Sequence, residues 1–385
     1  MVDLCSKPEL CCGCGACAEI CPKHAIEMKD SDNGFKYPEI NKEKCINCNL
    51  CLQVCDFKKF VPTENKPECY AARHKDITEL NTSRSGGFFM ALCRHVIDHN
   101  GVVFGCVIEK DMFVKHIYVK DYESCKRFKG SKYVQSDLMD TFNECFHFLE
   151  NDRYVLFSGT GCQIHGLLSF LEAKKVNMQK LITVDIVCHG VPSPGVFKNY
   201  IDEVEKRKNC KISEIDFRDK SLNGWADHIE KYGTDKGKQY YSKQWTTVFY
   251  RHILFRESCY NCKYTTTNRN SDFTIADYWG IGKNVPEFDD NKGCSLVLIH
   301  SNKAKSIFEE IKDYLEVRKT DIETSMQPQL QRPIWKGWDY KFFWKRYKKN
   351  PSKTIGMFFF PNKRTEMFWR AERGMKDIIK KVMRR

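Results

Sequence analysis

The sequence lacks the apolar segments that would carry a chain into or across a membrane. No uninterrupted apolar run reaches about 18 residues, which is the length that a membrane-spanning helix needs. The start of the chain also lacks the charged stretch, apolar run and small-residue cleavage site of a secretory signal peptide. The chain has 21 cysteines in 385 residues, and disulfides are a poor explanation for them. We expect a reducing, cytoplasmic location with metal–thiolate chemistry instead.

Two binding signatures are also missing. No Gly-x-Gly-x-x-Gly motif follows a predicted strand, so a Rossmann dinucleotide site is not supported. No recognised nucleic-acid-binding motif accompanies the net charge of +13, so nucleic acid is the least favoured partner.

Residues 11–55 contain two copies of one cysteine arrangement. The first is Cys11-x2-Cys14-x2-Cys17-x3-Cys21, followed by Pro22, and the second is Cys45-x2-Cys48-x2-Cys51-x3-Cys55. In two-cluster ferredoxins the fourth cysteine of each run ligates the other 4Fe-4S cluster. We therefore expect one cluster on Cys11, Cys14, Cys17 and Cys55, and another on Cys45, Cys48, Cys51 and Cys21. A zinc site needs only four ligands and leaves cysteines over, so this segment is predicted to carry electrons.

The rest of the chain predicts a mixed α/β body. A polar stretch with two prolines at 61–67 suits a linker out of a bacterial-ferredoxin-like domain at 1–62. Periodicity predicts helices at 86–100, 138–149, 159–171 and 194–208. Strands are predicted at 102–108, 113–119, 154–157, 181–187, 212–217, 273–276 and 295–299. We divide the body into parts at 63–150 and 151–330, followed by a basic aromatic tail at 331–385; whether the sheet is parallel stays open.

Two small-residue loops before predicted helices are suited to phosphate, because backbone N–H groups at a helix start attract anions. The first loop contains Ser83, Arg84, Ser85, Gly86 and Gly87. The second loop, 130–136, contains Lys132, Tyr133, Gln135 and Ser136. The alternatives are an ordinary serine cap with a glycine turn for the first loop and a solvated lysine for the second.

A second cysteine group follows in the body. Cys162 lies at a strand-to-helix turn, Cys188 ends a buried strand, and Cys259 and Cys262 form a Cys-x2-Cys pair. These four could hold one further 4Fe-4S cluster from three separate loops. Alternatively each is a buried small hydrophobe, which is the usual role of free cysteine. The nine remaining cysteines, Cys12 among them, are expected to be structural.

Positive charge is concentrated in the tail. Residues 335–385 contain 16 Lys and Arg but 4 Asp and Glu. Aromatic residues alternate with them: Trp335, Trp338, Phe342, Phe343, Trp344, Phe358, Phe359, Phe360 and Trp369. The tail is either a helical extension packed on the body, an anchor to an anionic inner-membrane surface, or a docking face for an acidic redox partner.

Several of these segments together resemble one family. They are Ser158-Gly159-Thr160-Gly161-Cys162-Gln163, Val187-Cys188-His189-Gly190-Val191-Pro192-Ser193-Pro194, Phe217-Arg218-Asp219-Lys220 with Gly224-Trp225, Cys259-x2-Cys262, and Asp272-Phe273-Thr274-Ile275-Ala276-Asp277-Tyr278-Trp279-Gly280. Over roughly 1–320 the chain resembles the coenzyme F420 hydrogenase/dehydrogenase beta-subunit family, in the form with an N-terminal two-cluster 4Fe-4S ferredoxin domain. It departs from the usual pattern at Asp56, Gly161 and His165.

The resemblance implies an oxidoreductase that uses FAD and iron–sulfur clusters, with a flavin-binding body. It would pass electrons between a ferredoxin-type partner and coenzyme F420, NAD(P)H or an organic substrate. Clusters exchange single electrons and these carriers exchange hydride, so a flavin must stand between them. We expect Arg218, Lys220 and Asp277 near the flavin, with Trp225 and Trp279. Alternatively the tryptophans are core anchors and Asp277 is a turn residue.

Two other functions compete with this one. The chain could be a non-catalytic electron-transfer subunit that connects ferredoxin to a hydrogenase or dehydrogenase subunit. It could also be an assembly or polysaccharide-locus accessory protein whose clusters are structural. Bound flavin and reducible clusters distinguish the three. The sequence leaves the oligomeric state open.

Overall fold

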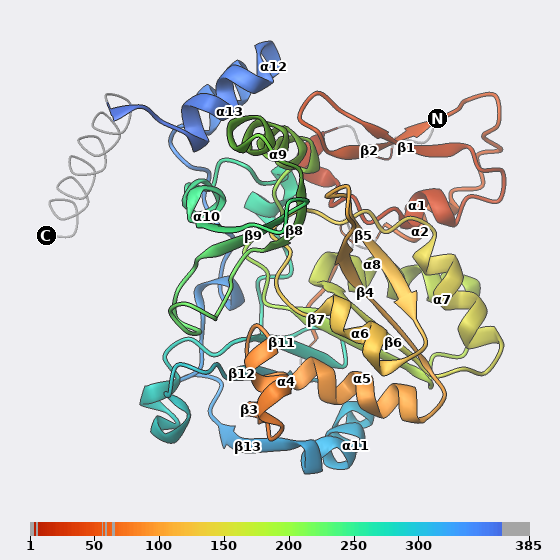
Figure 1. The fold of residues 1–385 in the computed structure, drawn as a ribbon. Helices are drawn as coiled ribbons and strands as arrows, with labels where there is room; N and C mark the ends of the chain where they lie inside the picture. Colours follow the sequence, from red (N-terminus) through yellow and green to blue (C-terminus); the bar gives the residue numbers. More distant parts are fainter. Residues whose placement is uncertain (1–3, 5–6, 56, 58–59, 64–65, 364–385) are drawn as a thin grey trace, which may run out of the picture.

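The structure, a computed structural model of the 385-residue chain, describes residues 4, 7–55, 57, 60–63 and 66–363 (Figure 1). Its N-terminal part has two short helices, α1 (Ala16–Glu19) and α2 (Leu50–Gln53), and a hairpin of β1 (Ile26–Asp30) and β2 (Lys36–Ile40). Each helix follows a residue with positive φ between the second and third cysteine of its run, Gly15 (78°) or Asn49 (63°). The two cysteine runs therefore form the same local structure.

An eight-stranded mixed sheet organises the body, in the order β13-β3-β12-β11-β7-β6-β4-β5. Its strands are β3 (Glu68–His74), β4 (Val102–Ile108), β5 (Val114–Val119), β6 (Val155–Thr160), β7 (Leu181–Ile186), β11 (Phe273–Asp277), β12 (Ser295–Ile299) and β13 (Leu315–Thr320). Neighbours among β4, β6, β7 and β11 are parallel, and the outer pairs are antiparallel. The two predicted parts, 63–150 and 151–330, thus share one sheet.

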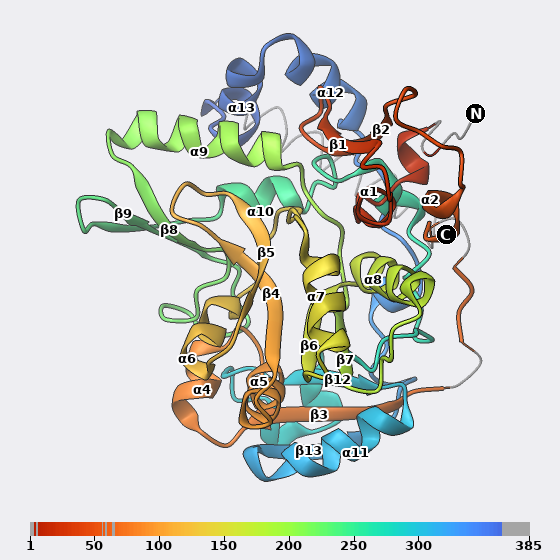
Figure 2. The same cartoon turned by 90° about the vertical axis from the view of Figure 1, so that its right-hand side faces the viewer.

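Helices cover both faces of this sheet (Figure 2). On one face α5 (Phe88–Asp98) and α11 (Asn302–Ile311) pack against Val103, Leu156 and Ile182. On the other, α7 (Thr141–Glu150) and α8 (Gly161–Lys174) pack against the alternate residues of the same strands. The inner strands are therefore buried on both sides, as parallel strands usually are.

A smaller layer lies beside the sheet. It contains the antiparallel strands β8 (Ile212–Asp216), β9 (Glu230–Thr234) and β10 (Gln239–Ser242), with helices α9 (Pro194–Lys208), α10 (Gln244–Phe249), α12 (Tyr340–Lys349) and α13 (Pro351–Phe359). Phe343, Trp344, Phe358 and Phe359 of the tail are buried in the same core as α9. The packed-extension interpretation of the tail holds for 340–360, whereas Trp369 lies outside the described residues.

The remaining elements are short. They are α4 (Ile77–Thr82), α6 (Tyr122–Cys125), and the 3-10 turns η1 (Pro8–Leu10), η2 (Lys126–Phe128), η3 (Glu257–Asn261), η4 (Ile281–Lys283), η5 (Pro286–Phe288), η6 (Lys312–Tyr314) and η7 (Pro328–Leu330). Within the described part of the chain, no helix has the length and apolarity required to cross a membrane.

The predicted elements were right at the centre of the fold and less accurate at their ends. The strands at 102–108 and 295–299 and the helix at 194–208 have the expected bounds. The helix expected at 159–171 begins at Gly161, because β6 continues to Thr160 and Gln163 closes a capping box with it. The sheet is mixed, which the sequence left open.

Candidate functional site

The N-terminal cysteines gather in two groups. Four of them, Cys21, Cys45, Cys48 and Cys51, line one small pocket. In the other group, burial and then the negative charges of Cys14, Cys11 and Cys55 raise the pKa of Cys17 well above its ordinary value. The fourth cysteine of each run therefore lies with the other run, so each group offers four thiolates, the donor set that a 4Fe-4S cluster requires.

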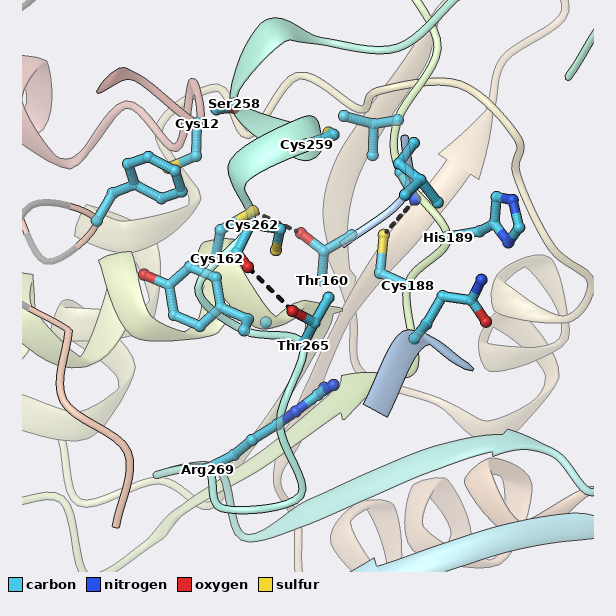
Figure 3. Close-up of a pocket in the computed structure, with 17 residues that line it drawn as sticks. Cys12, Thr160, Cys162, Cys188, His189, Ser258, Cys259, Cys262, Thr265 and Arg269 are labelled. Carbon is cyan, nitrogen blue, oxygen red and sulfur yellow. Dashed lines mark hydrogen bonds between the residues drawn. The ribbon is translucent and has the colours of Figure 1, made fainter. Parts of the chain in front are cut away.

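Cys162, Cys188, Cys259 and Cys262 line a second, interior pocket (Figure 3). Cys162 lies in the first turn of α8, and Cys188 follows the end of β7. Cys259 lies in η3 and Cys262 directly follows it. The structure thus brings these cysteines together from three loops, as a shared metal cluster would need. We call this set the interior cysteine site.

The thiols of the interior cysteine site differ in acidity. Burial raises the pKa of Cys188 and of Cys262 to about 12. A hydrogen bond from Cys12, opposed by burial and aided by the Thr160 hydroxyl, lowers the pKa of Cys162 to about 7. Bound metal deprotonates its thiol ligands, so a cluster at this site would hold Cys188 and Cys262 as thiolates despite their raised pKa.

Sequence reasoning missed Cys12, which we expected to be structural. Its side chain lines the interior pocket (Figure 3). It packs beside Cys14 and Cys162. Hydrogen bonds to the sulfurs of Cys14 and Cys162, followed by burial, raise the pKa of Cys12 well above its ordinary value. The adjacent pair Cys11-Cys12 was the only signal in the sequence, and it did not show which pocket Cys12 would face.

Two departures from the family pattern have a local structural explanation. A Cβ atom at Gly161 would lie 3.0 Å from Cβ of Tyr264, whose ring closes the pocket beside it. The ring of His165 lies 4.7 Å from the ring centroids of Phe60 and of Tyr264. Both departures therefore accommodate an aromatic cluster next to the interior cysteine site. The third, Asp56, lies outside the described residues.

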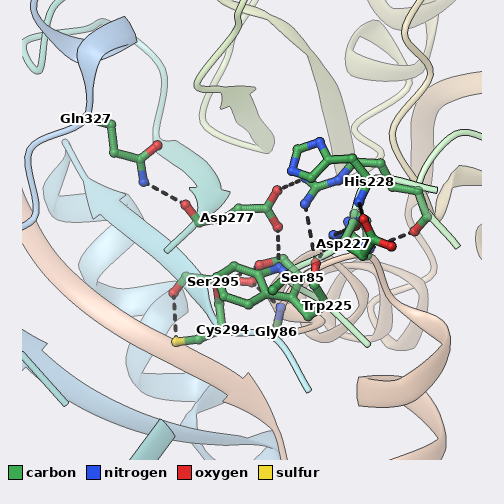
Figure 4. Close-up of polar contacts among 12 residues, drawn as sticks. Ser85, Gly86, Trp225, Asp227, His228, Asp277, Cys294, Ser295 and Gln327 are labelled. Carbon is green, nitrogen blue, oxygen red and sulfur yellow. Dashed lines mark hydrogen bonds and ion pairs between the residues drawn. The ribbon is translucent and has the colours of Figure 1, made fainter. Parts of the chain in front are cut away.

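The first predicted phosphate loop is firmly attached to the sheet. The backbone N–H of Gly86 donates to Oγ of Ser295 at 3.0 Å, and the Ser85 hydroxyl donates to the carbonyl of Cys294 at 2.6 Å (Figure 4). A Cβ atom at Gly86 would lie 2.1 Å from the carbonyl oxygen of Ala72. Gly87 has φ of 81° and is the N-cap residue directly before α5, and Ser83 is buried. Packing alone thus requires glycine at 86.

The second loop connects two regions. Nζ of Lys132 donates to the backbone carbonyls of Arg127, Phe128, Lys129 and Gly130, and burial lowers its pKa to about 8. Tyr133 stacks on Phe249, with ring centroids 4.6 Å apart. Nε2 of Gln135 donates to the carbonyl of Cys12 at 3.0 Å, and Nε2 of Gln163 donates to Oγ of Ser136 at 3.0 Å. Gln135 and Ser136 therefore face the cysteine sites.

Residues expected near a flavin form one group, the arginine–tryptophan cluster of Arg84, Arg218, Trp225, Asp277 and Trp279 (Figure 4 shows part of it). The Asp277 carboxylate accepts from Arg218 and, at 2.8 Å, from the Trp225 indole. Burial opposes ionisation of Asp277, but Arg218 and Arg84 outweigh it and lower its pKa. Trp225 and Trp279 stack at 4.6 Å, and Trp279 is 41% exposed.

Both arginines of this cluster retain unused donors. The Arg84 guanidinium donates to the carbonyls of Arg218 and Trp225, and Arg218 donates to Asp277. The Nε atoms of Arg84 and Arg218 are nevertheless buried without a hydrogen-bond partner among the described residues. Nζ of Lys220 donates to the carbonyls of Leu80 and Lys292, and burial lowers its pKa to about 8. The cluster is thus cationic and aromatic, and its arginines and Trp225 are buried, whereas Trp279 is exposed.

The fold and the cysteine groups define an iron–sulfur protein with a ferredoxin-type segment attached to an α/β body. Comparison with known proteins agrees with this class of protein. Residues 10–59 match the 4Fe-4S dicluster domain family. Residues 152–324 match the family described as coenzyme F420 hydrogenase/dehydrogenase, C terminus of the beta subunit. Two stretches of the chain are therefore similar, in this order, to a 4Fe-4S dicluster domain and to the C-terminal region of this beta-subunit family, in agreement with the resemblance seen in the sequence.

Individual relatives match parts of the chain. An uncharacterized polyferredoxin-like protein of Methanocaldococcus jannaschii is 47% identical over 55 residues, 12% of this chain and 33% of the relative. The F subunit of the F(420)H(2) dehydrogenase of Methanosarcina mazei is 22% identical over 192 residues, 47% of this chain and 53% of the relative. The chain thus spans about half or less of these curated relatives.

A solved structure was also found by comparison of folds. It is a chain in a structure of the F420-reducing [NiFe] hydrogenase complex from Methanosarcina barkeri. The two chains have a TM-score of 0.46 and 17% sequence identity, over 77% of this chain and 93% of that chain.

Proposed function

We propose that this chain is an iron–sulfur flavoprotein oxidoreductase that passes electrons between a ferredoxin-type partner and a two-electron carrier, coenzyme F420 or NAD(P)H, or an organic substrate. The observation that carries the proposal is the interior cysteine site, which lies beside the ferredoxin-type segment, with Cys12 of that segment in its lining. Electron carriers that lie close together in one chain can exchange electrons without a further protein.

The proposed ligand sets follow the three cysteine groups. Cys11, Cys14, Cys17 and Cys55 would hold the first cluster, and Cys21, Cys45, Cys48 and Cys51 the second. Cys162, Cys188, Cys259 and Cys262 would hold the interior cluster. Three cubane clusters would amount to about 12 iron atoms per chain.

FAD is the proposed mediator between these clusters and a two-electron partner. When bound, the flavin would supply the conversion between single electrons and a hydride. The arginine–tryptophan cluster supports this proposal, because Arg84 and Arg218 have buried donors without partners among the described residues and Arg218 lies beside the partly exposed ring of Trp279. Gly86 and Lys132 have structural roles that do not require the cofactor.

The test is cofactor analysis of anaerobically purified protein. We expect about 12 irons, bound FAD and reduction of F420, NAD(P)⁺ or an artificial two-electron acceptor by reduced ferredoxin. The double variant Cys259→Ala with Cys262→Ala should lose about four irons and retain the ferredoxin-type clusters. The buried Cys145→Ala on α7 is the matched control and should retain all iron. A flavin-free protein, or unchanged iron in the double variant, would contradict the proposal.

A second function is favoured by the comparisons. The named relatives include a dehydrogenase subunit, and the chain spans only part of its length. The chain would then be an electron-transfer subunit of a hydrogenase- or dehydrogenase-type complex, without catalysis of its own. Full iron content with no flavin, and activity only when the partner subunits are added, would favour this function over the first.

A further inference from the structure

Arg256 links the interior cysteine site to the first cysteine run. It precedes Cys259 by three residues, and its side chain is 1% exposed. Nε donates to the carbonyl of Cys11 at 2.8 Å, and Nη2 donates to the carbonyl of Lys36 at 2.7 Å. Nη2 also contacts Sγ of Cys11 at 3.5 Å. A cation from the interior segment thus lies against a thiol of the ferredoxin-type segment.

The sequence around Arg256 is adapted to this position. A Cβ atom at Gly13 would lie 2.8 Å from the guanidinium carbon, and Gly13 has φ of +75°, so glycine is required there on both grounds. Nη1 donates to Oε1 of Gln135 at 3.1 Å, while Nε2 of Gln135 holds the carbonyl of Cys12. The guanidinium therefore has a fixed place with all three nitrogens bonded.

The charge of Arg256 is not balanced by a carboxylate, since none among the described residues forms an ion pair with it. The guanidinium instead lies against Sγ of Cys11, and its carbon is 4.2 Å from the ring centroid of Tyr37. A buried cation is costly unless a negative group lies close to it. A cubane cluster with four thiolate ligands is negative in both of its oxidation states, so the first cluster would supply that charge.

Cys12 makes a second link between the same two groups. It is 7% exposed, and its side chain packs beside Cys14 of the first run and Cys162 of the interior site. Gly166 on α8 leaves the space that Cys14 occupies, because a Cβ atom there would lie 2.8 Å from Sγ of Cys14. The Cys12 side chain therefore lies between a proposed ligand of the first cluster, Cys14, and a proposed ligand of the interior cluster, Cys162.

We propose that Arg256 and Cys12 form the electron-transfer junction between the first ferredoxin-type cluster and the interior cluster, and that Arg256 raises the reduction potential of the first. The inference rests on the proposed function, because it assumes both clusters. One electron leaves one cluster, which is oxidised, and enters the other, which is reduced; no atom or proton is transferred. Positive charge and hydrogen bonds at the sulfurs favour the more negative, reduced state.

Redox titration followed by electron paramagnetic resonance, on the anaerobic holoprotein, tests the junction. Arg256→Gln removes the charge and retains hydrogen-bonding capacity. We expect the equilibrium constant for reduction of one cluster to fall at least about tenfold, which is ~59 mV for one electron, with smaller changes at the others. Arg73→Gln, which breaks ion pairs with Asp290 and Glu316 instead, is the control and should leave all potentials unchanged.

Cys12→Ser is the second variant, because loss of a buried arginine can prevent folding. We expect it to retain its iron, shift the potentials of the first and interior clusters, and weaken the magnetic coupling between them. Unchanged potentials and coupling in an iron-replete Cys12→Ser, or an unchanged first-cluster potential in an iron-replete Arg256→Gln, would overturn the junction while leaving the proposed function intact. A wild-type protein with only about eight irons would instead refute the interior cluster itself.

Discussion

Gly86 illustrates how a residue can resemble part of a ligand loop while the fold alone requires it. In the sequence, Ser-Gly-Gly before a helix suggested close approach of a phosphate. In the structure the space beside Gly86 is occupied by the backbone of β3 and β12. The sequence could not show this, because β3 was not predicted as a strand and Ser295 of β12 is 209 residues away. The same limit applies to Arg256 and Cys11, which are 245 residues apart.

Gly86→Ala should therefore lower the unfolding free energy of the body, and any loss of flavin binding should not be its only effect. The added Cβ would lie 2.1 Å from the Ala72 carbonyl oxygen, so we expect a loss of about 1–3 kcal/mol in unfolding free energy. Gly356→Ala is the control, since its nearest neighbour would be an Arg207 nitrogen at 3.7 Å and alanine suits a helix interior. Denaturant unfolding measures both; equal stability of the two variants would contradict the packing explanation.

His116 should make stability depend on pH. Burial lowers its pKa to about 4, while Nε2 bonds to the Ser158 carbonyl at 3.0 Å. Between about pH 6.5 and 4 the unfolded chain therefore binds a proton that the folded chain does not, so stability is present above this range and is lost as the pH falls. His116→Gln removes this contribution, and the wild-type advantage should shrink by about 1 kcal/mol from about pH 7 to 5.5. Parallel pH profiles in anaerobic guanidinium titrations would contradict this.

At the scale of elements, helices and strands with a strong local sequence pattern were predicted, and those without one were not. The apolar runs of β4 and β12 and the capped helix α9 were found with their bounds, because each pattern is strong within a few residues. Neither β3 nor β13 was predicted: β13 has charged residues at three of its six positions, and β3 has Glu68 and Arg73 near its two ends. They pair with each other at one side of the sheet, and that pairing, which no local pattern encodes, stabilises them.

The two tail helices should contribute stability through their aromatic face. Phe343 is fully buried and packs against Trp344, Tyr347 and Phe358. Phe343→Ala should cost about 3–5 kcal/mol, as expected for an aromatic side chain removed from a core. Lys345→Ala, two residues away and exposed, should change stability by less than about 0.5 kcal/mol. Similar melting temperatures for the two variants would show that the tail packs too loosely to matter.

At the scale of the whole molecule, the sheet order and the contact between the ferredoxin-type segment and the body determine where the cysteine groups lie relative to one another. Both cysteine runs and the Cys-x2-Cys pair were recognisable from spacing. Their juxtaposition depends on β6 and β7 lying side by side and on α8 meeting α1 and α2, which only tertiary structure defines. The cysteine groups could therefore be predicted from the sequence, whereas the contacts between them, through Arg256 and Cys12, could not.

The tail also has an outward face that we expect to meet an acidic partner. Lys341, Lys345, Lys349 and Lys353 are exposed, and Lys348 reaches Asp32 beside the β1–β2 turn at 3.6 Å. The basic face thus lies next to the ferredoxin-type segment, where a redox partner would deliver electrons. Truncation after Gln331 would remove the buried aromatic residues as well, so substitution of the four exposed lysines by glutamine is the cleaner test.

Electron transfer from reduced ferredoxin should slow in the four-lysine variant, most at low ionic strength, because attraction between surface charges is screened over about 8–10 Å at physiological salt. Substitution of Lys303, Lys305, Lys312 and Lys319 at the β13 side of the sheet is the control for the number of charges removed and should leave the rate unchanged. Because these lysines form ion pairs with Asp272, Glu68 and Glu309, the unfolding free energy of this variant is measured as well. Stopped-flow rates across a salt series measure this, and pelleting with anionic vesicles tests a membrane surface as the alternative partner. If the tail variant retains the wild-type rate and salt dependence, its lysines serve solubility alone. The partner must then dock on a surface other than the tail.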